Sequence, residues 1–287
     1  MPPPKRRTAL WLALAVVVGV GVAGWLVAKR GSPLVFGSPP CVATVAGHSA
    51  YLDQEQAHNA STITAVAVRR GLPARAVSIA LATAYQESDI RNLDYGDRDS
   101  LGIFQQRPSQ GWGTPAQVQD PVYAANAFYD ALVAVDGYQR LPITDAAQLV
   151  QRSAFGDAYA DHEADARAVA SALTGYSRAA FSCVVPEPSG DAPGAAARDA
   201  VRNVRTALVD AFGDVRADVR GRSGLAVAAG SRPRGWALAG YLVANADRLG
   251  ISSLSWDGRR WRAGDASEDG WRRYGQHRGD AIQVHVG

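Results

Sequence analysis

Cysteine is scarce in this 287-residue sequence, which contains two cysteines. Two are too few for a small fold held by several disulfides or for a cysteine-rich zinc module, which excludes both classes. A basic excess is also lacking, because the residues beyond position 30 carry 25 basic and 27 acidic side chains. A polybasic nucleic-acid-binding protein is therefore disfavoured, and no nucleic acid is expected as a partner. Since 47% of the residues are apolar, the chain is expected to fold.

No charged residue occurs between positions 8 and 28, where the sequence reads TALWLALAVVVGVGVAGWLVA. About 20 apolar residues are enough for a helix to cross the hydrocarbon core of a bilayer. Trp11 and Trp25 lie near the ends of this segment, and basic residues flank it on both sides. We therefore predict a cytoplasmic basic arm and one transmembrane helix within residues 1–30, in the cell membrane, with the bulk of the chain extracytoplasmic. A cleaved signal peptide is the alternative.

Composition divides the remaining sequence. Cys41 and Cys183 bracket one domain, so outside the cytoplasm a disulfide between them is expected. Two independent buried thiols are the alternative. Proline and glycine interrupt regular structure on either side of this domain. The expected segments are a stalk at 31–40, a first domain at 41–184, a linker at 185–195 and a second domain at 196–287.

The first domain is predicted to be all-α. Asp53, with Gln56 three residues later, is a typical N-cap for a helix over residues 53–70. The next segment, residues 74–88, is apolar on nearly every side, which predicts a helix buried in the domain. No run of alternating strand residues precedes position 183. Further helices are expected at 120–132, 144–154 and 159–175.

Glu87 lies at the C-terminal end of the predicted buried helix. Burial raises the pKa of a carboxyl group, and the negative end of the helix dipole acts in the same direction. A carboxyl group that is protonated near neutral pH suits general acid catalysis, so Glu87 is the candidate catalytic residue. An ion pair with Arg91, four residues later, is the alternative.

Glu87-Ser88 is followed, after a polar loop, by the run SLGIFQQRP at residues 100–108. This arrangement resembles the lysozyme-like superfamily, most closely the soluble lytic transglycosylases. Those enzymes carry Glu-Ser at the end of a buried helix, then Gly-aliphatic-Met-Gln, with Pro three residues beyond the Gln; Phe104 stands here for the Met. The longer run GDRDSLGIFQQRPSQGWG is similar to a group of membrane-anchored actinobacterial proteins. The resemblance covers residues 45–176, although the family's Tyr-Asn-Ala-Gly segment has only AFGDAYADH, with Tyr159, as its nearest counterpart.

The resemblance implies cleavage of the glycan strands of peptidoglycan, with Glu87 protonating the leaving glycosidic oxygen. Lytic transglycosylases use the N-acetyl group and 6-hydroxyl of the substrate in place of a second carboxylate. In goose-type lysozymes, loop aspartates help to place a water, so Asp97 and Asp99, with Asp94 nearby, keep muramidase chemistry open; turn formation is the alternative. Residues expected to bind sugar are Ser100, Gln105 and Gln106 by hydrogen bonds and Tyr95, Trp112 and Tyr159 by stacking, with a core role as the alternative for each aromatic residue.

The second domain is predicted to be small and α+β, with a hairpin at Asp257-Gly258. Its four tryptophans indicate a sizeable core or a binding face. Helices are expected at 195–213 and 236–249, and strands at SGLAVAAG, ISSLSW, RRW and the terminal AIQVHV.

This order of helices and strands resembles that of a C-terminal domain found in secreted cell-wall proteins. That domain is distantly similar to the zinc D-alanyl-D-alanine carboxypeptidases. Their pattern has a His two residues before Ser-Gly-x-Ala-Val-Asp, and His-Val-His near the end. Here Gly221 and Ala228 stand at the first His and Asp positions, and Gln283-Val284-His285 keeps one His. Zn²⁺ needs three or four protein ligands, and His285, even with His277 as a second ligand, supplies too few. Neither a metal nor another cofactor is therefore predicted.

The predicted fold class is therefore an N-terminal transmembrane helix, an all-α lysozyme-like domain and a small, non-catalytic α+β domain. The predicted function is membrane-anchored, extracytoplasmic cleavage of peptidoglycan by a lytic transglycosylase or muramidase. A catalytically inactive peptidoglycan-binding scaffold of the cell envelope is the alternative. The expected partners are glycan strands and, through the N-terminal helix, the membrane; the sequence specifies no protein partner.

Overall fold

The computed structural model describes residues 41–151, 156–188, 194–275 and 279–287. They belong to one compact unit, Ser38–Gly287, which contains both of the domains expected from the sequence. The predicted basic arm, transmembrane helix and stalk lie outside the described residues.

No helix in the described part of the chain is both long enough and apolar enough to cross a membrane. The predicted spanning segment at residues 8–28 falls outside that part. The fold class with a transmembrane helix and the location in the cell membrane are therefore corrected, because no element among the described residues supports either.

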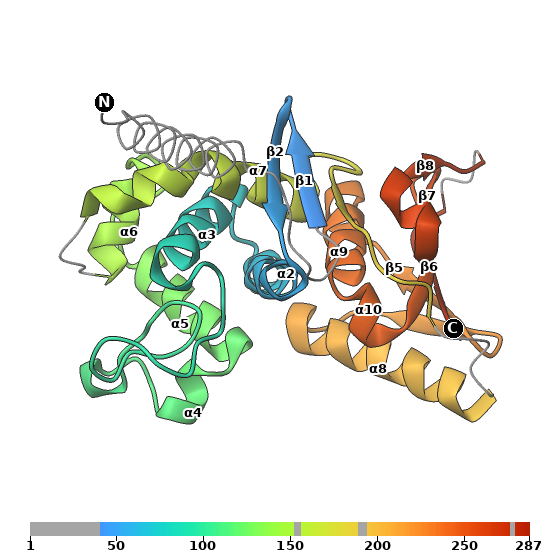
Figure 1. The fold of residues 1–287 in the computed structure, drawn as a ribbon, viewed down its shortest axis with the longest axis horizontal. Coiled ribbons are helices and arrows are strands. Elements are labelled where there is room, and N and C mark those ends of the chain that lie inside the picture. The colour runs from blue at the N-terminus through green and yellow to red at the C-terminus, as the bar shows by residue number, and fades with distance from the viewer. Residues whose placement is uncertain (1–40, 152–155, 189–193, 276–278) are drawn as a thin grey trace, which may run out of the picture. The chain divides into compact units, whose positions relative to one another are not determined.

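The first part of the chain contains a sheet, so the prediction of an all-α domain is wrong. Strands β1 (Cys41–Val45) and β2 (His48–Leu52) form a hairpin (Figure 1). Strand β3 (Phe181–Cys183) pairs with β1 on its other side. All pairs are antiparallel. Ala46 and Gly47 both take positive φ in the hairpin turn. The strands are too short for an alternating pattern to stand out, and β3 joins the sheet only when the chain returns to β1.

The predicted helices of this part are present with small shifts in their bounds. Asp53 caps α2 through a capping box with Gln56, as predicted. The helix expected from residue 159 begins at Glu163, after a 3-10 turn over Gly156–His162. The helices are α2 (Gln54–Arg69), α3 (Ala74–Ser88), α4 (Pro115–Val118), α5 (Pro121–Val133), α6 (Ile143–Gln151) and α7 (Glu163–Leu173), with a further 3-10 turn at Pro108–Gln110.

The C-terminal part is built on a six-stranded antiparallel sheet in the order β4-β5-β9-β6-β7-β8. The hairpin between β6 and β7 turns at Asp257-Gly258, as predicted, with positive φ at both residues. The second expected helix begins earlier than predicted and is interrupted at Asn245. The elements are α8 (Gly194–Phe212), β4 (Ala217–Arg220), β5 (Gly224–Ala228), α9 (Arg232–Ala244), α10 (Ala246–Leu249), β6 (Ile251–Trp256), β7 (Arg259–Arg262), a 3-10 turn (Gly264–Asp269), β8 (Arg272–Arg273) and β9 (Ala281–Val286).

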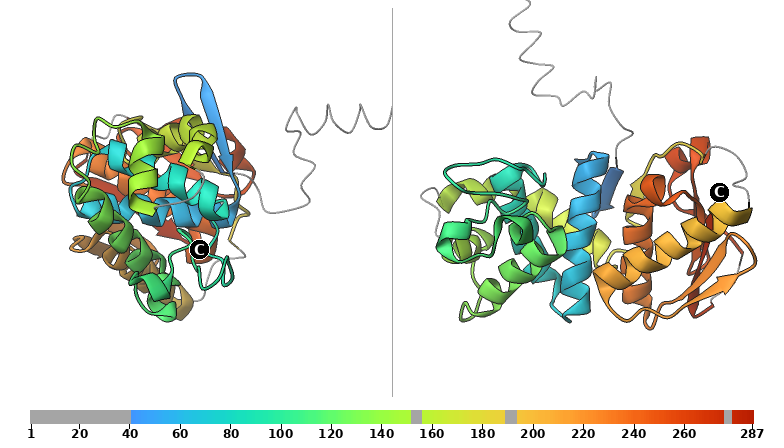
Figure 2. Two further views of the ribbon diagram at one scale, coloured as in Figure 1. Left: turned by 90° about the vertical axis from the view of Figure 1, so that its left-hand side faces the viewer. Right: turned by 90° about the horizontal axis from the view of Figure 1, so that it is seen from below.

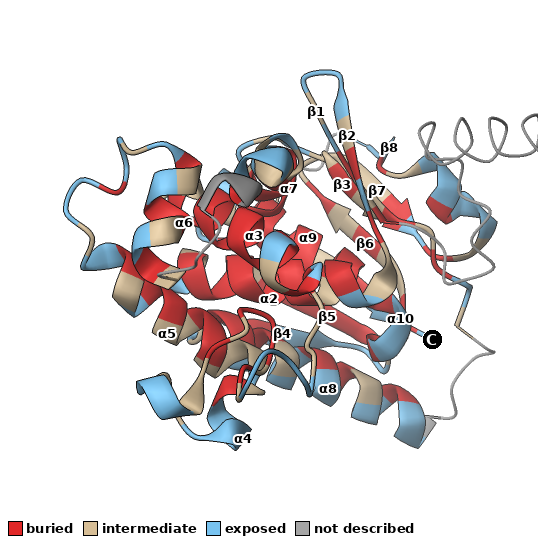
Figure 3. Cartoon of the chain, turned by 60° about the vertical axis from the view of Figure 1, so that its left-hand side comes forward, coloured by how far each residue is buried: buried red, intermediate tan, exposed pale blue. Residues whose placement is uncertain are grey.

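Helix α2 joins the two parts of the chain. It lies between the helices of the first part and α9 of the second (Figures 1 and 2). Gln54 Nε2 donates to the Ala244 carbonyl at 2.8 Å, and the Asn245 side chain contacts His58 at 2.5 Å and Ser61 at 3.2 Å. Helices α2, α3 and α9 are almost wholly buried, whereas α8 exposes one face (Figure 3). The buried side chains of both parts form one continuous core.

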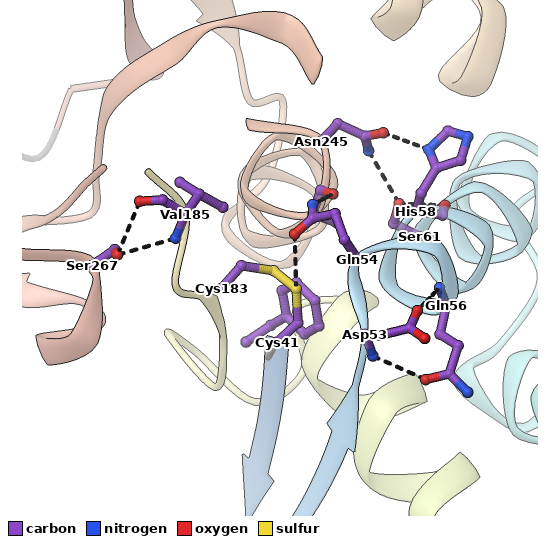
Figure 4. The surroundings of a disulfide bond; sticks show 12 residues. Cys41, Asp53, Gln54, Gln56, His58, Ser61, Cys183, Val185, Asn245 and Ser267 are labelled. Atoms are coloured by element: carbon purple, nitrogen blue, oxygen red, sulfur yellow. Dashed lines mark hydrogen bonds between the residues drawn. A yellow bond between two sulfur atoms is a disulfide. The ribbon is translucent and has the colours of Figure 1, made fainter. Parts of the chain in front are cut away.

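The predicted disulfide between Cys41 and Cys183 is confirmed (Figure 4). It joins directly opposed residues of β1 and β3, 142 positions apart in sequence. Residues 183–185 are also hydrogen-bonded to the C-terminal part. Ser267 Oγ lies 3.1 Å from the Val185 amide nitrogen, and Trp261 Nε1 donates to the Cys183 carbonyl at 3.2 Å. The disulfide therefore lies where the first part of the chain meets the second.

Candidate active site

Glu87 projects from the last turn of α3, whose earlier turns are buried. The Glu87 side chain is half-buried and accepts a hydrogen bond from the Tyr159 hydroxyl at 2.8 Å. The Gln151 amide also hydrogen-bonds this carboxyl group. Arg91, the alternative partner from the sequence, instead pairs with Asp53 and Glu55.

Two opposed effects act on the pKa of Glu87. Burial raises the pKa because it disfavours the charged form, and the hydrogen bonds from Tyr159 and Gln151 lower it because they stabilise that form. Burial is the larger effect, so the pKa lies above that of an exposed glutamate. The direction agrees with the one expected for a general acid.

Ser88 connects the end of α3 to the run that carries the family resemblance. Its hydroxyl donates to the Ile103 carbonyl at 2.7 Å and accepts from the Arg91 amide at 3.1 Å. Gln151 contacts the same run, since its Nε2 donates to the Phe104 carbonyl at 2.7 Å. The position of the Glu87 carboxyl group thus depends on α3, which carries it, and on Gln151 of α6, which hydrogen-bonds it. The Ile103 and Phe104 carbonyls in turn fix Ser88 and Gln151.

The run over residues 101–106 folds as a tight turn that requires Gly102. Leu101 and Gln106 pair through two backbone hydrogen bonds of 3.0 Å. Gly102 has a φ of +78°, and a Cβ there would lie 2.2 Å from the Val118 carbonyl oxygen. Only glycine meets both conditions. The turn positions the two carbonyl groups that Ser88 and Gln151 contact.

A cavity of about 720 Å³, which we call the Trp112 cavity, lies between the ends of α5 and α6 and residues 110–112. Gln151, which hydrogen-bonds the Glu87 carboxyl group, is one of its lining residues. Trp112 is partly exposed and lines the cavity with Gln110 and Val150. An aromatic ring with amide groups nearby is a suitable lining for a sugar, so Trp112 keeps its predicted role as a proposal.

The other predicted sugar-binding residues are placed differently. Tyr159 is fully buried, so its ring is not a stacking surface, and it acts on Glu87 through its hydroxyl. Ser100 and Gln106 are also buried, and Gln106 Nε2 donates to the Ala124 carbonyl at 3.1 Å. Gln105 is half-buried, and its amide donates within its own loop. Tyr95 is 68% exposed.

The two predicted second carboxylates differ in their contacts. Asp99 accepts from the Ser109 amide at 2.7 Å and from Arg107 Nε at 3.1 Å. The hydrogen bonds from Ser109 lower the pKa of Asp99 to about 2. The Asp97 side chain is 87% exposed, 4.0 Å from Arg98 Nε. Asp99 therefore closes its own loop, and Asp97 faces solvent.

No group of three or more His, Cys, Asp or Glu side chains within the described ranges could hold a metal ion. His285 is exposed on β9, opposite Gly224 on β5 and Ser253 on β6. His277 lies outside the described residues. The tryptophans of this part belong to its core, since all are buried: Trp236, Trp256, Trp261 and Trp271.

Comparison with known families concerns the C-terminal part. Residues 194–286, from α8 to the last strand, match a family described as VldE, C-terminal domain. This match spans less than half of the chain, and its description states no activity. No curated protein matches the chain. The resemblances to lysozyme-like enzymes and to zinc carboxypeptidases therefore stay predictions from sequence motifs.

Sequence reasoning did not identify Gln151. It lies 64 residues after Glu87, on another helix, and a single glutamine in an amphipathic helix carries no distinguishing signal. The sequence predicts a stacking role for Tyr159, because an aromatic residue in a predicted cleft suggests a platform for a sugar ring. Only the packing of the 3-10 turn against α3 shows that its hydroxyl reaches Glu87.

Proposed function

We propose that this chain cleaves the glycan strands of peptidoglycan with Glu87 as the general acid. The observation that carries the proposal is the Glu87 carboxyl group, half-buried at the end of α3, with a pKa raised by burial and hydrogen bonds from Tyr159 and Gln151. A carboxyl group in this setting retains its proton at a higher pH than an exposed one. It then has a proton to donate to a glycosidic oxygen.

The Trp112 cavity supports the proposal, because it provides space for a sugar next to Gln151, a hydrogen-bond partner of the acid. Its volume of about 720 Å³ is in the range of small-molecule sites. A sugar ring stacked on Trp112 would share the cavity with Gln151, which hydrogen-bonds the Glu87 carboxyl group. Recognition by stacking also suits a domain with a net charge of −5 over residues 41–184, which offers no attraction to an anionic polymer.

Between the two predicted reactions, the contacts of Asp99 favour transglycosylation. Its carboxylate is engaged by Ser109 and Arg107, which leaves it poorly placed to orient a water. In the proposed reaction, Glu87 gives its proton to the glycosidic oxygen as the bond from that oxygen to the sugar C1 breaks. The 6-hydroxyl of the same sugar then bonds to C1 and returns its proton to Glu87, which yields a 1,6-anhydro end.

The test is incubation of the purified full chain with peptidoglycan, followed by mass analysis of the products. We expect 1,6-anhydro ends. Reducing ends would show that water is the nucleophile, and intact glycan that co-sediments with the protein would identify the binding scaffold. The Glu87→Gln variant is expected to lose about 10²- to 10⁴-fold in rate while it remains folded. Glu163→Gln, the same change at a residue paired with Arg167 on α7, is the matched control and should keep full activity.

A further inference from the structure

A second cavity, which we call the arginine cavity, lies between the C-terminal sheet and the segment after α7. Its volume is about 720 Å³. Arg178 follows α7, Arg232 begins α9, Arg259 begins β7 and Arg273 ends β8. Four arginine residues from four separate segments of the chain thus line one space.

The positive charge of this cavity is only partly balanced. Asp257 is the one carboxylate among the described lining residues, and its side chain is 9% exposed. It pairs with Arg232 at 3.1 Å and with Arg178 at 3.6 Å. Among the described residues, Arg259 and Arg273 have no carboxylate partner. The lining therefore keeps three surplus positive charges.

Contacts within the protein orient three of the four arginines and the aspartate before any ligand arrives. Asp257 accepts from the indole nitrogen of the buried Trp236 at 3.3 Å, which holds the carboxylate that orients Arg178 and Arg232. Arg259 is oriented by a hydrogen bond of 3.3 Å from its Nη1 to the Trp271 carbonyl. Preorganised guanidinium groups lose less conformational entropy when they bind an anion.

We propose that the arginine cavity binds a ligand that carries more than one phosphate group. Guanidinium groups from several directions match the tetrahedral oxygens of phosphate, whereas a planar carboxylate is satisfied by one guanidinium fork. A phosphate monoester group carries about −1.5 to −2 charges, so two such groups balance three surplus positive charges. The volume exceeds the need of a single ion, since one water occupies about 30 Å³ in the liquid.

Calorimetric titration of the full chain with sodium pyrophosphate tests this site. Pyrophosphate is expected to bind more tightly than inorganic phosphate or succinate. Arg273→Ala should weaken its binding about tenfold or more, because a charge-assisted hydrogen bond is lost. Arg272→Ala is the matched control, since Arg272 is the neighbouring residue of β8 and pairs with Asp269 outside the cavity. Arg273→Lys should restore part of the affinity.

Two results would overturn the proposal. One is that neither pyrophosphate nor poly(glycerol phosphate) binds more tightly than succinate. The other is equal weakening by Arg273→Ala and Arg272→Ala, which would show attraction to general surface charge. A parallel titration with poly(glycerol phosphate) identifies the chemical class of the ligand. Arg273-dependent binding of pyrophosphate indicates a diphosphate. Arg273-dependent binding of the polymer alone indicates a repeating phosphodiester. Melting temperatures verify that each variant is folded.

Discussion

The hydroxyl of Tyr159 donates a hydrogen bond to Oε1 of Glu87 across 2.8 Å, although 72 residues separate the two in sequence. The contact brings a 3-10 turn against the end of the most buried helix of the first part. It lowers the pKa of Glu87 while burial raises it, so the protonation of this carboxyl group depends on both. Tyr159 is therefore a positioning residue for the proposed acid.

Replacement of Tyr159 by Phe tests that relationship. The variant loses a hydrogen bond that stabilises the carboxylate, so the pKa of Glu87 is expected to rise further. Since the proposed acid acts when protonated, the alkaline limb of the pH profile of kcat/KM should move to higher pH. The rate at low pH should fall by about tenfold or less. Tyr129→Phe is the control, because that buried hydroxyl donates to the Ile63 carbonyl and not to Glu87; an equal shift in both variants would contradict the assignment.

The raised pKa of Glu87 also predicts how stability depends on pH. A group with a folded pKa above its unfolded value stabilises the fold fully below the unfolded pKa, about 4.3 for Glu. This contribution is lost as the pH rises through the folded pKa. Glu87→Gln mimics the protonated form, so its melting temperature should equal that of the parent chain near pH 4 and exceed it increasingly toward pH 7. The exposed Asp97→Asn serves as control, and a constant difference across this pH range for Glu87→Gln would refute the raised pKa.

Gly102 and Gly111 form a matched pair for testing the turn beside Glu87. Both have positive φ, but a Cβ at Gly102 would collide with the Val118 carbonyl, whereas a Cβ at Gly111 meets nothing within 4 Å. Gly111→Ala is expected to lower the free energy of unfolding by about 1–2 kcal/mol. Gly102→Ala should cost about 2–5 kcal/mol, since overpacking strain adds to the backbone cost. Urea unfolding measures both, and equal losses would mean that the close approach to Val118 has no energetic consequence.

The Cys41–Cys183 disulfide is expected to stabilise the compact unit strongly. It closes a long loop, because the two cysteines are 142 positions apart in sequence. Its removal in the Cys41→Ser, Cys183→Ser double variant should lower the free energy of unfolding by about 2–5 kcal/mol. Chemical denaturation with and without reductant provides the measurement. Reductant should destabilise the parent chain and leave the double variant unchanged; sensitivity of the double variant would assign the effect to something other than this bond.

Local patterns in the sequence determined much of the helical structure. Asp53 and Gln56 predict the start of α2, and the apolar run before Glu87 predicts a buried helix, because capping and helical periodicity depend on residues only a few positions apart. The hairpin at Asp257-Gly258 follows from the preference of that dipeptide for positive φ. The cysteines could be paired because the sequence contains only two.

The surroundings of each candidate site were decided by tertiary structure. The contacts of Glu87 with Tyr159 and Gln151 depend on how α3 packs against α6 and the following turn. Asp99 is an open candidate in the sequence, and the fold engages it with Ser109. The arginine cavity joins four distant segments, and no local pattern relates its members. The sequence alone thus identified the candidate acid, because the pattern that predicts its helix lies in residues that are close together in sequence. Its partners became known only from the fold, because contacts between distant residues arise when the elements pack together.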